Sequence, residues 1–99
     1  MTRIKELADE IKDELHSAKC YAEEYLSFKA KGDGNWANLY KEMSQEELKH
    51  AGYIHDRVVA DIEELRKVYT PPQDMMDKWD ADHKKYIEKA AWVRQMLAM

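Results

Sequence analysis

Three residues of the chain, Glu14, Glu47 and His50, combine ligand-type side chains with a spacing that suits a metal site. Glu47 and His50 stand three positions apart, so a helix would project both side chains from one face. All three interrupt stripes of residues that are otherwise apolar or aromatic. A carboxylate that faces an apolar core is costly unless it is paired, protonated or bound to metal. We therefore expect one common explanation for the three positions.

The stripes belong to three helical stretches, which are separated by two breaks in the sequence. Residues 31–35 form a turn cluster with two glycines that can end a helix, and Asn35 is the expected N-cap of the next helix. Pro71 and Pro72 mark the second break, because neither proline fits a helix interior. The sequence therefore predicts helices over about residues 2–30, 35–69 and 72–98 of a single domain.

Apolar residues recur at helical spacing in each stretch. The first stretch, which Leu15, Ala22 and Leu26 widen on one side, carries Ile4, Leu7, Ile11, Glu14, Ala18, Tyr21, Tyr25 and Phe28. The second carries Trp36, Tyr40, Met43, Glu47, His50, Ile54, Val58, Ile62 and Leu65. The third, which is looser, carries Met76, Trp79, His83, Tyr86, Ala90, Val93 and Leu97. Because long helices joined by a short turn pack antiparallel, the first two stretches predict a helical hairpin.

The hairpin would bring the three ligand-type residues to one level. From a turn centred near residues 32–33, Glu14 lies about 18 residues along one arm, at about 1.5 Å of rise per residue. Glu47 and His50 lie about 15 and 18 residues along the other arm, within one helical turn of the same height. Two carboxylates and one imidazole would therefore share one level of the predicted core.

Composition excludes several other classes of protein. The chain has 99 residues, 44% of them hydrophobic and 36% charged, which favours one folded domain over a disordered chain. A net charge of −4, with both signs interspersed, argues against nucleic-acid binding. No long apolar run is present, so we expect neither a membrane span nor a signal peptide. The single cysteine, Cys20, fits a reducing compartment, and we expect a cytoplasmic protein.

The ligand pattern resembles half of the set in ferritin-like carboxylate proteins. That family uses a Glu from each of two helices and a Glu-x-x-His from each of two others. Glu14, Tyr21 seven positions later, and the run from Glu46 to Ala51 look like the first half of a bacterioferritin or rubrerythrin. The chain is also similar to encapsulated ferritin-like proteins, which carry one hairpin per chain. The resemblance covers about residues 4–62, and residues 72–98 offer only Asp80, Asp82 and His83 in place of a second Glu-x-x-His.

The resemblance implies an all-α fold, in which an antiparallel two-helix hairpin plus a short C-terminal helix forms a ferritin-like four-helix bundle by dimerisation. Two copies of Glu14, Glu47 and His50 would supply four carboxylates and two imidazoles, and two divalent ions would balance the charge of the carboxylates. These donors suit Fe or Mn, with Zn as a redox-silent competitor. The implied function is a ferroxidase for iron handling or detoxification, which oxidises Fe(II) with dioxygen or peroxide at an intersubunit di-iron site. Tyr21 would donate an electron or hydrogen-bond a ligand.

The expected assembly is a homodimer or a higher multiple of dimers. One hairpin encloses no storage cavity, so any mineral would lie in a larger shell made by this protein or by a partner. Encapsulated relatives carry a C-terminal cargo peptide rich in Gly and Leu, which residues 91–99 do not resemble. Residence inside a protein compartment therefore stays open.

Other interpretations of the same residues also stay open. Glu14 and Glu47 would form a buried ion-pair network with His50, or with a lysine or arginine, if their role were only to fix helix pairing. The protein would then be a metal-free helical structural or interaction module, such as a phage accessory protein. A third alternative is a non-enzymatic dimer that binds or senses Zn or Mn through the same six ligands.

The remaining polar and aromatic candidates are expected to have ordinary roles. Tyr25, Trp36 and Tyr40 are expected to fill the core. His16 and His55 lie off the stripes and are expected to be exposed. His83 is expected to pack on the third helix or to support the site from outside, and Cys20 to behave as a small hydrophobe.

Overall fold

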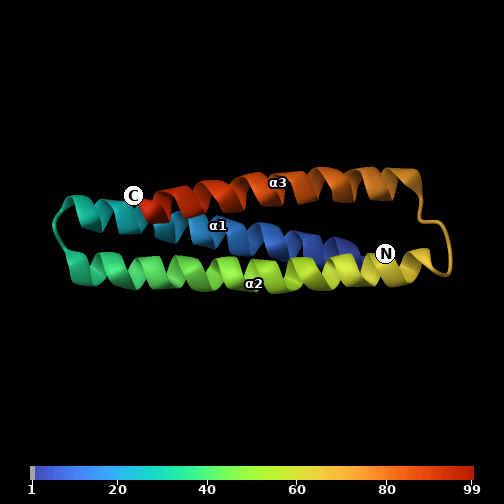
Figure 1. The fold of residues 1–99 in the computed structure, drawn as a ribbon, viewed down its shortest axis with the longest axis horizontal. Coiled ribbons are helices and arrows are strands. Elements are labelled where there is room, and N and C mark those ends of the chain that lie inside the picture. The colour runs from blue at the N-terminus through green and yellow to red at the C-terminus, as the bar shows by residue number, and fades with distance from the viewer. Residues whose placement is uncertain (1) are drawn as a thin grey trace.

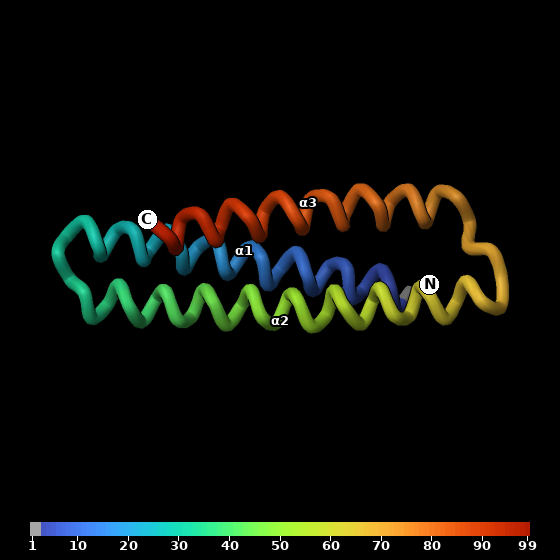
Figure 2. Tube along the Cα trace, viewed as in Figure 1, coloured from blue at the N-terminus to red at the C-terminus, as the bar shows by residue number. Residues whose placement is uncertain are grey.

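A computed structural model describes residues 2–99, which form three α-helices. These are α1 (Thr2–Ala30), α2 (Gly34–Arg66) and α3 (Gln73–Ala98). The chain runs up α1, back along α2 and up again along α3, and α1 lies against both of the other helices (Figures 1 and 2). The predicted all-α fold with an antiparallel hairpin is confirmed. The third helix has 26 residues and begins one residue later than expected, so its bounds agree with the prediction.

The bundle is elongated, with principal extents of 55 × 18 × 17 Å. Its Cα radius of gyration is 16.1 Å, whereas a compact domain of this length has a radius of about 13 Å. Helices α1 and α3 run in one direction and α2 in the other (Figure 1). Three helices in this arrangement leave much of each helix surface facing solvent. No helix among residues 2–99 meets the length and hydropathy needed to cross a lipid bilayer.

The turn between α1 and α2 combines a glycine-based stop with a side-chain start. Gly32 adopts a left-handed φ of 78°, which a residue without a Cβ tolerates. The backbone N–H of Asp33 then donates to the Phe28 carbonyl at 3.0 Å, and that of Gly32 to the Lys29 carbonyl at 3.0 Å. The Asp33 side chain accepts from the Trp36 N–H at 3.2 Å, so Asp33 is the N-cap of α2. The prediction of Asn35 as N-cap is wrong, because Asp33 occupies the cap position and the helix begins at Gly34.

The end of α2 differs from the prediction by three residues. The helix stops at Arg66 and not at residue 69, and the N–H groups of Lys67 and Val68 donate to carbonyls three positions earlier. A residue that precedes proline disfavours helical backbone, so the chain leaves the helix before it reaches Pro71. Pro72 then caps α3, accepting from the Met76 N–H at 3.2 Å.

Small side chains form the centre of the contact between α1 and α2. Ala18, Ala22, Ser44 and Ala51 have no exposed surface, and the Ser44 hydroxyl donates to the Ala18 carbonyl at 2.7 Å. Side chains of this size let two helix axes approach closely. The two long helices are therefore held together by a tight seam over their middle turns.

The predicted core stripe of α2 is wrong over its first half. The buried residues of that half are Ala37, Ser44, Leu48 and Ala51. The predicted residues Trp36, Met43, Glu47 and His50 each precede one of them and lie half-buried or exposed. Ala37, Ser44 and Ala51 are smaller than the residues before them and fit where the helices touch. Leu48 is buried because it is apolar, whereas Glu47 before it is charged. Val58 and Ile62 of the predicted stripe are buried as expected, whereas Leu65 is half-buried.

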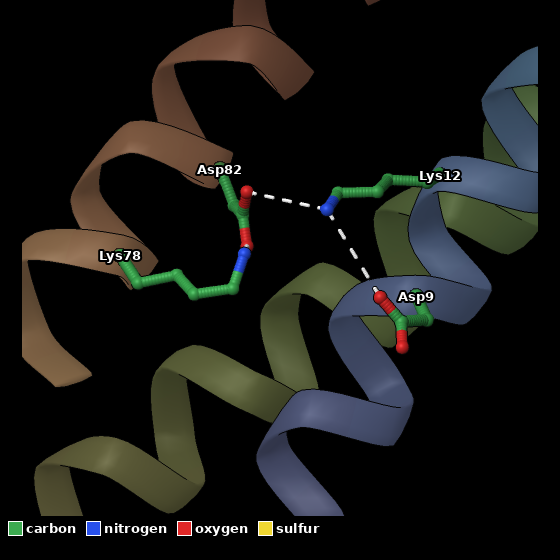
Figure 3. Close-up of polar contacts among 4 residues, drawn as sticks. All are labelled: Asp9, Lys12, Lys78 and Asp82. Carbon is green, nitrogen blue, oxygen red and sulfur yellow. Dashed lines mark hydrogen bonds and ion pairs between the residues drawn. The ribbon is translucent and has the colours of Figure 1, made fainter.

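The third helix docks on α1 through a group of ion pairs as well as apolar contacts. Lys12 of α1 lies between two carboxylates, 3.4 Å from Asp82 of α3 and 4.0 Å from Asp9 (Figure 3). Lys78 reaches the other oxygen of Asp82 at 3.3 Å, and the Asp82 side chain is only 11% exposed. The carboxylate is shielded, whereas Lys12 and Lys78 are 49% and 59% exposed, so these pairs are only partly screened by solvent. They help to fix the height of α3 along the hairpin.

Candidate metal centre

The structure brings Glu14, Glu47 and His50 together at the middle of the hairpin. One ligand atom from each residue lies within 4.8 Å of the others. His50 Nδ1 is 3.7 Å from an oxygen of Glu14 and 4.0 Å from an oxygen of Glu47. Glu14 comes from α1, whereas Glu47 and His50 come from successive turns of α2. The three residues therefore share one level, as the spacing along the two arms predicts.

The tight seam beside the cluster explains how side chains of this length meet. Ala18 stands one helical turn after Glu14, while Ser44 and Ala51 stand one turn before and after Glu47. All three are fully buried at the contact of the two helices. The backbones are close here, so a glutamate on α1 reaches an imidazole on α2.

The cluster lies at the open edge of the hairpin and not inside its core. Exposed fractions of the side chains are 29% for Glu14, 23% for Glu47 and 49% for His50. The core position predicted for them is therefore wrong for the single chain. The cavities between the hairpin and α3 are lined by other residues, so α3 covers a different side. The imidazole is the most accessible member of the group.

Acidic groups outnumber basic groups in the cluster. Among the residues that the structure describes, no Lys or Arg nitrogen lies within 4.0 Å of the carboxylates of Glu14 and Glu47. Within 4.0 Å, His50 is the only basic neighbour that the described residues supply. Its distances of 3.7 and 4.0 Å exceed the 2.7–2.9 Å or so of a charge-assisted hydrogen bond. An ion-pair network with a lysine or arginine is therefore not formed. The arrangement concentrates negative charge that a cation would neutralise.

The donor set fits a divalent metal in type and in size. Carboxylate oxygens and an imidazole nitrogen, without a thiolate, suit iron, manganese or zinc. At metal–ligand distances of about 2.0–2.2 Å, two ligands of one ion lie at most about 4.4 Å apart. The three ligand atoms lie within 4.8 Å of one another, so small changes of rotamer would bring them to one ion. Three protein ligands would leave further coordination positions open on the exposed side.

A row of aromatic side chains continues from this level toward the turn. The Tyr21 ring lies 6.0 Å from the Tyr40 ring, and Tyr40 stacks on Phe28 at 5.5 Å. Trp36 completes the row, 6.0 Å from Phe28, and it is 50% exposed. Tyr25 is buried as predicted, whereas the core position predicted for Trp36 is wrong. No hydrogen bond within residues 2–99 joins Tyr21 to Glu14, Glu47 or His50.

The predictions for His55 and Cys20 are wrong. His55 was expected to be exposed, but its side chain is 13% exposed and its Nε2 lies 2.8 Å from Nδ1 of His83. It faces α3, which the hairpin stripes do not describe. Cys20 is exposed and not a core residue, with its sulfur 3.7 Å from Nε2 of His16. His16 is exposed, as predicted.

Comparisons of the chain with protein-family models, curated proteins and solved structures find no match.

Proposed function

We propose that this chain is a ferroxidase-type iron protein, which oxidises Fe(II) at a di-iron site shared between two copies. The observation that supports the proposal most strongly is the convergence of Glu14, Glu47 and His50 from two helices. In the described part of the chain, no lysine or arginine nitrogen lies within 4.0 Å of the two carboxylates. Ligand-type residues at matching levels of both arms are the pattern that the ferritin-like resemblance implies. The native metal would be iron, with manganese or zinc as alternatives.

A second copy is needed because one chain supplies only half of the ligand set. The cluster is part-exposed on a side that α3 leaves open. The neighbouring residues on that side include half-exposed Trp36 and part-buried Tyr40 and Met43, which a partner helix pair would cover. Two hairpins placed face to face would bring four carboxylates and two imidazoles together. Two divalent ions would cancel the four negative charges, as a site shielded from water favours.

The roles of the residues follow from their chemistry. Glu14 and Glu47 would bind iron through their carboxylates, and His50 would bind through Nδ1, the nitrogen that faces both of them. The bound iron would supply the electrons that reduce dioxygen or peroxide. Tyr21, at the end of the aromatic row, would donate an electron. Alternatively, it would form a hydrogen bond to a metal ligand once the dimer has assembled.

An aerobic titration with Fe(II) tests the proposal against its rivals. The proposal predicts a coloured ferric product that saturates at two irons per dimer. Colourless binding at the same stoichiometry would instead identify a redox-silent metal-binding or sensing dimer. Absence of any binding would leave a structural or interaction module. The variant Glu46→Ala is a matched control, because Glu46 neighbours Glu47 but is exposed on another side of the helix.

The proposed dimer also makes a geometrical prediction. In a ferritin-like arrangement the two-fold axis passes through the metal level, so the two α1–α2 turns lie at opposite ends. Asn35 precedes Glu47 and His50 by 12 and 15 residues, which is about 18–22 Å along α2, so the two copies of Asn35 would stand about 36–45 Å apart. Spin labels at Asn35, in a Cys20→Ala background, would report that distance by pulsed dipolar spectroscopy. Labels within about 25 Å would contradict the opposed arrangement and require both turns at one end.

Asn35 is preferable to Asp33 as the labelling position. The Asp33 carboxylate caps α2 through the Trp36 N–H, and its replacement would weaken the helix start. Asn35 is exposed and makes no such contact.

A further inference from the structure

A second group of metal-ligating side chains lies between α2 and α3, away from the carboxylate cluster. His55 of α2 and His83 of α3 face each other, with 2.8 Å between Nε2 of His55 and Nδ1 of His83. Neither residue belongs to the site described above, and the proposed ferroxidase makes no use of them. We propose that His55 and His83 form a second metal site for a divalent ion that favours imidazole, such as Zn²⁺ or Cu²⁺, and that the ion ties α3 to the hairpin.

The distance between the nitrogens carries the first step of the argument. At 2.8 Å only one of the two nitrogens can hold a proton, so the lone pair of the other points toward its neighbour. Two nitrogens bound at about 2.0–2.1 Å to one metal lie about 2.8–3.0 Å apart at a right angle and about 3.3–3.4 Å apart in a tetrahedron. The two nitrogens therefore need to move apart by at most about 0.6 Å for a metal ion to take the place of the proton between them.

A carboxylate on α2 supports the required tautomer. Nδ1 of His55 lies 3.2 Å from an oxygen of Asp56. When Nδ1 donates its proton to this carboxylate, Nε2 keeps its lone pair and faces His83. Metal-binding histidines commonly donate their second nitrogen to a carboxylate in this way, which fixes the ring and makes the ligating nitrogen more basic.

Aromatic rings hold the pair on two further sides. The His55 ring stacks on Tyr86 at 4.5 Å and lies 6.0 Å from Trp79, and the Trp79 and His83 rings are also 6.0 Å apart. The His55 side chain is only 13% exposed. Rings packed in this way restrict the rotamers of both ligands, so less freedom is lost on binding.

An adjoining cavity leaves room for the remaining ligands. A cavity of about 480 Å³ is lined by both histidines, and it holds enough space for water molecules to complete the coordination. The charged and titratable groups that face the pair come from all three helices. They are Lys12, Asp13 and His16 on α1, Asp56 on α2, and Asp82, Lys85 and Lys89 on α3.

The charges around the pair are balanced, so they neither attract nor repel a cation strongly. Three lysines and two carboxylates line the cavity, and Asp56 adds a third carboxylate beside His55. The Asp82 carboxylate is already held by Lys12 at 3.4 Å and Lys78 at 3.3 Å. Selectivity must then come from the nitrogen donors themselves, for which Cu²⁺ and Zn²⁺ bind more tightly than Fe²⁺ or Mn²⁺.

Zinc titration of the full-length chain, followed through the imidazole ¹⁵N resonances, tests the inference. We expect stoichiometric Zn²⁺ to shift the signals of His55 Nε2 and His83 Nδ1 and to leave those of exposed His16 unchanged. His50 reports the carboxylate site in the same spectra, so the two proposals can fail separately. If Zn²⁺ moves His50 alone, or moves none of these signals at equimolar metal, the proposed second site is wrong.

Calorimetry on variants provides the second measurement. His55→Gln and His83→Gln should each weaken one class of Zn²⁺ binding by at least about tenfold, since loss of even an outer partner of a ligand costs 10- to 100-fold. His16→Gln, on the same cavity wall, is the matched control and should bind as the parent chain does. Parent-like affinity and stoichiometry in both Gln variants would overturn the inference, whether or not the control behaves as expected.

Discussion

Replacement of Glu47 by alanine should abolish iron binding and leave the fold almost unchanged. The Glu47 side chain is 23% exposed, and one of its carboxylate oxygens lies 4.0 Å from Nδ1 of half-exposed His50. Exposed ion pairs contribute about 0.2–1 kcal/mol to stability, and alanine is at least as good a helix former as glutamate. We therefore expect the free energy of unfolding to change by less than about 1 kcal/mol, which corresponds to a melting-temperature shift below about 8 °C.

Two measurements on the same preparation separate a ligand from a structural residue. Thermal unfolding followed by circular dichroism gives the stability, and anaerobic Fe(II) titration gives the number of ions bound. Glu46→Ala removes the neighbouring carboxylate, which is exposed, and should keep the parental iron stoichiometry. The reasoning is refuted if Glu47→Ala binds as much iron as the parent. It is also refuted if the variant unfolds, because Glu47 would then be a structural residue.

Three further substitutions test other parts of the account. Tyr21→Phe should keep iron binding but slow the appearance of the ferric product, and an unchanged oxidation rate in stopped-flow absorbance would exclude Tyr21 from the reaction. Ser44→Ala should cost about 1 kcal/mol of stability, because it removes one buried hydrogen bond to the Ala18 carbonyl; urea unfolding that shows no loss would mean that the hydroxyl does not contribute. Asp33→Ala should cost about 1 kcal/mol in the same assay through loss of the α2 N-cap, whereas Asn35→Ala should cost much less.

The hairpin and the level of the site could be predicted from the sequence because both depend on local quantities. Glycines at the turn and prolines before α3 divide the chain, and a constant rise per residue places Glu14 beside Glu47 and His50. These predictions do not depend on which residues face the core. The structure accordingly shows the three helices and the three-residue cluster.

The choice of buried face in α2 could not be predicted in the same way. Hydropathy favours Trp36 and Met43 as core residues, but the structure buries Ala37 and Ser44 in their place. A small residue is favoured at the point of contact because it lets the two helices approach closely, and this depends on both helices together. Sequence periodicity lacks this information, because it considers one helix at a time.

The position of α3 escaped prediction for a related reason. His55 lies off the predicted stripe, but it follows buried Ala51 by four positions and precedes buried Val58 by three, so it belongs to the stripe that the structure buries. The error in the predicted stripe therefore made His55 look exposed. Its contacts with His83 and the ring of Tyr86 depend on α3 and could not be read from α2 alone.

Sedimentation equilibrium with and without anaerobic Fe(II) tests the central claim, a metal site shared between two copies, most directly. A ligand that binds only the dimer must stabilise the dimer. Without metal, four converging carboxylates would oppose association. The account predicts that Fe(II), at one ion per chain, shifts the protein from its monomer mass of 11.7 kDa toward twice that value. The same shift should be absent in His50→Ala. An identical monomer–dimer equilibrium with and without iron would contradict an intersubunit site.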